Sequence, residues 1–297
     1  MERSFVESST CTRRTVLWTA ALGAVALALP KDLFAARDAS KIGISVQLYS
    51  VRDDCGKDFD AALERIAKMG FAGVEFAGYH SYGGKPKELR KRLDDLKLTA
   101  TGTHTGTGSI RGDGLKGTID FCQTVGIKYL IVPGDGDLTN PEKCKAFAET
   151  FNKATETLKP LGMACGYHNH TEIAKVDPET KKTFWELFAE RTSKDVVLQQ
   201  DIGWTVAAGL DPVALIKEFP GRTKVPHFKP CVTGKDKDKK AILGQDSVKW
   251  ADVIEACASV GGTEWFVVEQ EAYPDGKSPM ECTELSLAGL KKLLGRS

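Results

Sequence analysis

The stretch KIGISVQLYSVRDDCGKDFDAALERIAKMG, residues 41–70, shows the unit from which the chain is built. Its apolar residues first form a run of strand length at 42–48 and then recur with helical spacing at 58–70, where Gly70 is a stop signal. An open doubly wound sheet normally carries a glycine-rich fingerprint after its first strand, and this stretch has none. The unit therefore favours a closed barrel.

The same unit recurs to the end of the chain. Strands that alternate with helices indicate a parallel sheet, and eight such units in roughly 250 residues predict one α/β domain, a single (β/α)8 TIM barrel. We assign residues 39–297 to this domain. The expected strands are 42–48, 72–77, 98–104, 128–133, 163–170, 196–202, 222–229 and 263–271, and the expected helices are 58–70, 86–97, 114–126, 141–162, 182–191, 211–220, 246–261 and 278–294.

Residues 1–38 have the organisation of an export signal. Arg13 and Arg14 precede an apolar stretch at 16–29, which is shorter than the roughly 20 residues of a membrane span. The order of charge and apolar core is typical of a signal peptide, and Thr-Arg-Arg-x-Val-Leu resembles a twin-arginine signal; the alternative is an arbitrary amphipathic helix. We predict a removable signal peptide, export to the periplasm and a mature protein without a membrane span.

Replacing Arg13 and Arg14 with lysine is expected to abolish export, because a receptor reads the arginine pair and not the positive charge alone. Cell fractionation followed by N-terminal sequencing measures this. A wild-type protein found in the cytoplasm with an intact N-terminus would contradict the prediction.

Charge and cysteine content exclude several classes of protein. The chain has 41 lysines and arginines against 40 aspartates and glutamates, so its net charge of +1 gives no electrostatic reason to bind nucleic acid or an anionic membrane. None of its eight cysteines forms a C-x-x-C pair, which argues against a zinc knuckle and a thioredoxin-like motif. We expect most cysteines to be buried apolar residues. If the protein is exported, one or two disulfides are the alternative.

Polar side chains collect where the expected strands end. The active site of a (β/α)8 barrel lies at the C-terminal ends of its strands, and four of the five histidines fall there. Burying unpaired charge at one rim is costly and therefore needs a reason. The residues concerned are Gln47, Glu75, His104, His168, His170, Asp201, Trp204, His227, Lys229, Glu269 and Glu271.

One divalent metal ion is the simplest reason. His168, Asp201, His227 and Glu269 come from the last four expected strands, which are neighbours in a closed barrel. Two imidazoles and two carboxylates suit Mn²⁺, Co²⁺, Zn²⁺ or Fe²⁺. Each residue also has a simpler interpretation: a histidine with a structural hydrogen bond, an aspartate that caps a turn, or a glutamate that pairs with Lys229.

Six motifs resemble those of the xylose-isomerase-like barrel superfamily, which contains sugar and sugar-phosphate isomerases and epimerases and also inosose dehydratase. They are GVEFAG (73–78), TGTH (101–104), GYHNH (166–170), QQDIGW (199–204), PHFKP (226–230) and VVEQE (267–271). The resemblance covers residues 41–295 and implies one metal held by His168, Asp201, His227 and Glu269. His168 departs from the epimerase pattern, in which a glutamate at this position often acts as a base, and YHNH is similar to the dehydratase-like branch.

The resemblance implies a metal-dependent sugar isomerase or epimerase that abstracts the proton next to a carbonyl through a metal-stabilised enediolate. A metal-dependent lyase or dehydratase acting on a keto-sugar or cyclitol and a non-catalytic sugar-binding barrel are the alternatives. The expected partner is a small sugar or sugar derivative. Whether the protein forms a homo-oligomer is left open by the sequence. The candidate bases are Glu269, Glu271, His104 and His170, and Lys229 is a candidate proton donor or ion-pair partner. The candidate substrate contacts are Gln47, Glu75, His170 and Trp204. We expect His170 or Asn169 to fix the imidazole tautomers.

Overall fold

Eight parallel strands form one sheet in residues 37–296, the part of the chain that the computed structural model describes. Their order is β6-β5-β4-β3-β2-β1-β8-β7, and a single parallel bridge between Asp201 and His227 joins the two end strands. The sheet is therefore a nearly closed barrel, which confirms the predicted fold. The strands are β1 (Gly43–Gln47), β2 (Gly73–Phe76), β3 (Thr99–His104), β4 (Tyr129–Val132), β5 (Ala164–His168), β6 (Val197–Gln199), β7 (His227–Phe228) and β8 (Trp265–Val268).

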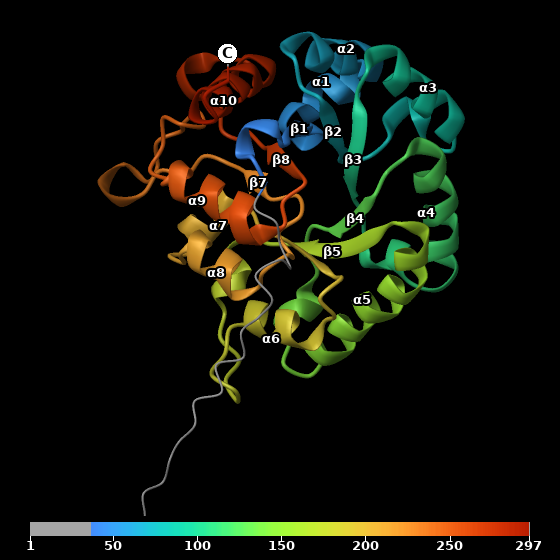
Figure 1. The fold of residues 1–297 in the computed structure, drawn as a ribbon, viewed down its shortest axis with the longest axis vertical. Coiled ribbons are helices and arrows are strands. Elements are labelled where there is room, and N and C mark those ends of the chain that lie inside the picture. Colours follow the sequence, from blue (N-terminus) through green and yellow to red (C-terminus); the bar gives the residue numbers. More distant parts are fainter. Residues whose placement is uncertain (1–36, 297) are drawn as a thin grey trace, which may run out of the picture. The chain divides into compact units, whose positions relative to one another are not determined.

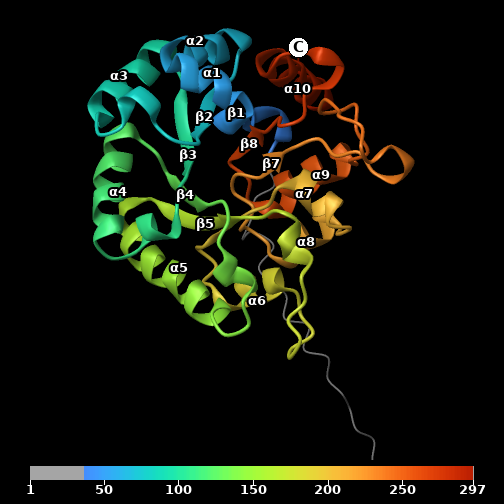
Figure 2. The same cartoon turned by 180° about the vertical axis from the view of Figure 1, so that it is seen from behind.

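The helices surround the strands as an outer ring (Figure 1). The first and last units lie side by side in this view and in the reverse view (Figure 2), because β1 pairs with β8. The predicted signal peptide falls almost entirely outside the described residues. The helices are α1 (Arg52–Lys57), α2 (Phe59–Met69), α3 (Pro86–Leu96), α4 (Gly112–Val125), α5 (Cys144–Leu158), α6 (Phe184–Arg191), α7 (Ile202–Ala207), α8 (Pro212–Glu218), α9 (Trp250–Ala256) and α10 (Pro279–Leu293).

Local sequence signals set the helix ends. The Asp58 side chain accepts a hydrogen bond from the Ala61 amide at 3.0 Å at the start of α2, and Gly70 ends that helix with a φ of 93°. Thr183 and Glu186 form a reciprocal capping box at the start of α6. These side chains fix where α2 and α6 begin.

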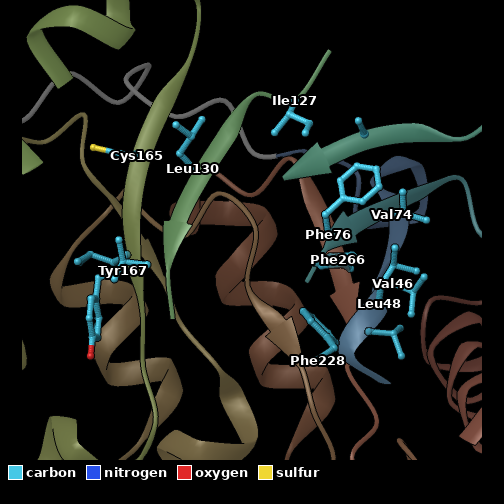
Figure 3. Packing of buried hydrophobic residues seen from close by; sticks show 14 of the residues in the cluster. Val46, Leu48, Val74, Phe76, Ile127, Leu130, Cys165, Tyr167, Phe228 and Phe266 are labelled. Atoms are coloured by element: carbon cyan, nitrogen blue, oxygen red, sulfur yellow. The ribbon is translucent and has the colours of Figure 1, made fainter. Parts of the chain in front are cut away.

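The apolar core lies between the strands and the helices. Phe228 on β7 and Phe266 on β8 pack with ring centroids 4.7 Å apart, and Phe228 stacks on Trp250 of α9 at 5.0 Å. Figure 3 shows both phenylalanines among the side chains of this cluster. The strands are therefore held by helix packing on their outer side, which leaves their C-terminal ends free to carry polar side chains.

The sixth and seventh strands are shorter than the sequence predicts. The predicted strand at 196–202 ends at Gln199, because the Asp201 side chain accepts a hydrogen bond from the Trp204 amide and so begins α7. The strand predicted at 222–229 is reduced to His227–Phe228, directly after Pro226, which cannot donate a ladder hydrogen bond. β6 therefore stops before Asp201, whereas β7 begins with His227 and stops before Lys229.

The seven cysteines in the described residues are all free thiols, and six of them are buried, so within this part of the chain the expectation of buried apolar cysteines holds. No helix among residues 37–296 is both long enough and apolar enough to cross a membrane.

Candidate metal centre

Four side chains from neighbouring barrel units meet at one point. One donor atom from each of His168, Asp201, His227 and Glu269 lies within 4.8 Å of all the others, and all four residues are buried. His168 ends β5, His227 begins β7, and Asp201 and Glu269 follow β6 and β8. The structure thus brings the predicted ligand set together, although metal binding itself stays a prediction.

Asp201 has one oxygen engaged and one free. Its Oδ1 accepts a hydrogen bond from the Trp204 amide at 2.7 Å, whereas its Oδ2 is buried without a hydrogen-bond partner among the described residues and lies 3.9 Å from His227 Nδ1. Burial raises the pKa of Asp201 to about 7, even though Lys229 opposes that shift. The aspartate therefore caps α7, as the simpler interpretation has it, and still leaves a costly unpaired oxygen that a cation would satisfy.

His227 lies between two carboxylates. Its Nε2 is 2.5 Å from Glu75 Oε2, and its Nδ1 is 2.9 Å from Glu269 Oε2. Burial alone would lower the pKa of His227, but these carboxylates raise it to about 10. The imidazole thus carries a positive charge within the cluster, at a place where a metal ion bound to Nδ1 could replace the Nδ1 proton.

The chemistry of these donors fits the predicted divalent ion. Two imidazole nitrogens and two carboxylate groups suit Mn²⁺, Co²⁺, Zn²⁺ or Fe²⁺. Burial, followed by the neighbouring cation on His227, holds the pKa of His168 well below its usual range, so this imidazole is neutral and has a lone pair to offer. Burial would raise the pKa of Glu269, but Lys229 and His227 hold it well below its usual range, so the carboxylate is ionised.

The imidazoles are held by residues that the sequence did not lead us to expect. Gln199 Oε1 lies 3.1 Å from His168 Nδ1, and Glu75 takes the Nε2 of His227. The prediction that His170 or Asn169 would fix the tautomers is wrong, because the Asn169 side chain instead accepts a hydrogen bond from the Asp201 amide at 2.9 Å. The spacing of two between Gln199 and Asp201 in QQD, which places both on the same side of a strand, was the available signal.

A pocket of about 550 Å³ opens directly beside the cluster. This volume is within the range of small-molecule sites. The hydrogen bonds that His170 donates to Glu172 come from its backbone amide and not from its ring, so the imidazole can bind a polar ligand at this wall. The predicted residues that line the pocket are His104, His168, His170, Glu269 and Glu271, and Tyr49 contributes an aromatic side chain.

Three other predicted substrate contacts lie off this lining. Gln47 and Glu75 are fully buried and hydrogen-bond each other at 3.0 Å, and Trp204 packs against Lys229 with Nζ 4.8 Å from the ring centroid. Their contact with substrate stays a prediction.

Lys229 is the nearest cation to the cluster. Its Nζ forms an ion pair with Glu271 and lies 3.7 Å from Glu269 Oε2. A Cβ atom at Gly203 would come within 2.6 Å of the Lys229 carbonyl oxygen, so the glycine makes room for this strand end. The ion-pair interpretation of Lys229 therefore describes its state in the structure, and transfer of a proton would require the pair with Glu271 to open.

The fold agrees with comparisons to known proteins. A family described as the xylose isomerase-like TIM barrel matches residues 63–293. The chain belongs to this family. Its curated relatives include an inosose dehydratase of Clostridium botulinum, 24% identical over 284 residues that cover 82% of this chain and 94% of the relative. Another, from Geobacillus thermodenitrificans, is 23% identical over 259 residues and covers 75% and 85%.

Solved structures show the same fold. A sugar phosphate isomerase/epimerase from Parabacteroides distasonis superposes with a TM-score of 0.71 at 24% identity and covers 88% of this chain and 95% of its own. A probable 3-DHS dehydratase from Bacillus anthracis gives 0.62 at 15% identity, with 84% and 99% covered. Members with both kinds of name therefore share this barrel, and identity at this level shows the fold alone.

Proposed function

We propose that this chain is a divalent-metal-dependent enzyme that removes the proton next to a carbonyl group of a sugar or sugar derivative and then isomerises or epimerises it. The observation that carries the proposal is the buried cluster of two imidazoles and two carboxylates beside a pocket of about 550 Å³. His168, Asp201, His227 and Glu269 would hold the metal, and a bound divalent ion supplies Lewis-acid polarisation of the carbonyl.

Glu271 is the best-placed base for the proton. It lines the pocket, its side chain is 27% exposed, and it lies outside the proposed ligand set. Lys229, its ion-pair partner, holds the carboxylate at the wall of the pocket. Glu269 has the competing task of pairing with His227, so a base on that side is better supplied by Glu271.

His170 offers a proton from another part of the pocket wall. Its ring lies 4.9 Å from that of His168 and 5.5 Å from that of Trp204, measured between centroids. Its backbone amide donates to the Glu172 carboxylate at 3.1 Å, which fixes the chain while leaving the imidazole free for a hydroxyl group of the substrate. His104 is less available, because its Nε2 lies 2.8 Å from Gln199 Oε1.

Elimination of water is the second candidate outcome. Epimerisation uses a base on each face of the reacting carbon, and a histidine stands at position 168 where a second carboxylate would serve as one of them. The curated relatives named above are inosose dehydratases. Both outcomes begin with the same proton abstraction and differ in whether a proton returns to carbon or a neighbouring hydroxyl group leaves.

Incubation with ketohexoses, their 3-keto derivatives and a keto-inositol in deuterated water is expected to place deuterium on the carbon next to the carbonyl, and only when Mn²⁺ or Co²⁺ is present. Mass spectrometry and NMR of the products measure this. An isomer or epimer of unchanged formula supports the first outcome, and a product lighter by one water supports elimination. If the protein bound a sugar tightly but gave neither deuterium exchange nor product with any divalent metal added, the enzymatic proposal would be contradicted. A sugar-binding barrel would then be favoured.

A further inference from the structure

Glu75 on β2 is a carboxylate buried in the interior of the barrel, away from the pocket. It is fully buried, and Gln47 and Gln199 donate hydrogen bonds to it at 3.0 and 2.7 Å. A Cβ atom at Gly102 would lie only 2.9 Å from Glu75 Oε1, so the neighbouring strand has a glycine where the carboxylate needs space. A buried charge with this many dedicated partners is costly to keep and calls for a role.

The first link from Glu75 leads directly to His227. Glu75 Oε2 lies 2.5 Å from His227 Nε2, and an ionised carboxylate can only accept hydrogen bonds. The Nε2 atom must therefore carry the proton. In the neutral imidazole that a metal ion requires, the lone pair is then on Nδ1, the atom that faces Glu269 and Asp201.

The second link reaches His168 through Gln199. Because Gln199 Nε2 donates to Glu75 Oε1, the orientation of this amide is fixed and its Oε1 can only accept. That oxygen lies 3.1 Å from His168 Nδ1, which must therefore be the protonated nitrogen. The lone pair of His168 is left on Nε2, because the hydrogen bond of this ring to Gln199 is made through Nδ1, and His168 lines the pocket.

We propose that Glu75 is the positioning residue of the metal centre and sets the tautomers of both imidazole ligands, His227 directly and His168 through the Gln199 amide. The inference rests on the proposed metal dependence. Hydrogen bonds to metal-bound imidazoles orient the ring and fix which nitrogen binds the ion. Here one carboxylate does this for two histidines on different strands, from a position outside both the proposed ligand set and the pocket lining.

Glu75→Gln is the direct test. The substituted amide offers one accepting oxygen where the carboxylate offers two, and its NH₂ group can turn the Gln199 amide around. That turn would present hydrogen-bond donors to His168 Nδ1 and drive its proton to Nε2, the nitrogen that should bind metal. The affinity of chelator-stripped protein for Mn²⁺ or Zn²⁺ alone, measured by calorimetry, is expected to fall roughly 10- to 100-fold.

Ser45→Ala is the matched control. Ser45 is a fully buried polar residue of the barrel interior that bonds to Thr101 Oγ1 at 2.8 Å and has no hydrogen bond to the cluster. Its loss should leave metal affinity unchanged. If Glu75→Gln does not fold, Gln199→Met removes the link to His168, together with the Gln199 bonds to His104 and Glu75, and leaves the bond between Glu75 and His227 in place. This variant should still weaken metal binding.

A spectroscopic readout separates positioning from simple stabilisation. In the Zn²⁺-loaded wild type, imidazole ¹⁵N–¹H spectra should show His227 protonated on Nε2 and His168 on Nδ1. Equal metal affinity in wild type and Glu75→Gln, or the opposite tautomers, would overturn the role of Glu75 and leave the proposed function standing. A wild-type protein that binds no divalent metal would overturn both.

Discussion

Replacing His168 with alanine is expected to abolish turnover and to weaken metal binding. The loss of metal affinity should exceed the roughly 10- to 100-fold that follows when a metal ligand loses its hydrogen-bond partner. The variant removes one of four donors that lie within 4.8 Å of one another and leaves the oxygen of Gln199 facing an empty space. The fold should persist, because His168 is at the C-terminal end of β5, outside the apolar layer between strands and helices. Calorimetry with Mn²⁺, together with far-ultraviolet circular dichroism, measures both effects.

His80→Asn is the control for loss of a histidine. His80 is exposed, packs against Phe59 with centroids 4.7 Å apart and does not line the pocket. Its φ of 45° is one that asparagine tolerates, so the change should leave metal affinity and turnover intact. If His168→Ala retained full metal affinity, the ion would have to be held elsewhere. A second group of possible donors, His104, His168 and His227, would be excluded by the same result, because it also contains His168.

The barrel could be predicted from the sequence because its signal is distributed. Each apolar run and each helical repeat contributes to the count of eight, so an error in one unit does not change the fold. The strand at 196–202 shows the limit of this approach. The prediction carries this strand on to Ile202, but the Asp201 side chain caps α7, and the strand ends at Gln199. A local hydrogen bond here prevails over periodicity.

The clustering of His168, Asp201, His227 and Glu269 was predictable for a similar reason, since the C-terminal ends of parallel strands must meet at one rim. What the sequence does not contain is how deep each side chain lies. Glu75 and Glu269 both stand at strand ends, yet only Glu269 lines the pocket, while Glu75 lies among Gln47, Gln199 and His227. That difference arises from barrel closure, which brings β2 opposite β6 and β7 and is invisible in any single stretch.

Glu271→Gln is expected to lower turnover by about 10²- to 10⁴-fold while metal affinity stays close to that of the wild type. Glu271 lines the pocket and pairs with Lys229, but it is outside the proposed ligand set, so the substitution removes a base without removing a donor. Steady-state kinetics in saturating Mn²⁺, with calorimetry on the same preparation, measures the two quantities separately.

Glu284→Gln on α10 is the matched control, because it makes the same chemical change at an exposed position. Two outcomes of Glu271→Gln are informative beyond the expected one. Loss of metal together with turnover would place Glu271 in the ligand set, in competition with Glu269. Full turnover would remove Glu271 as the base and transfer that role to His170, whose hydrogen bonds to Glu172 leave its ring free. Lys229, freed from its ion pair with Glu271, would then be available to stabilise the developing negative charge.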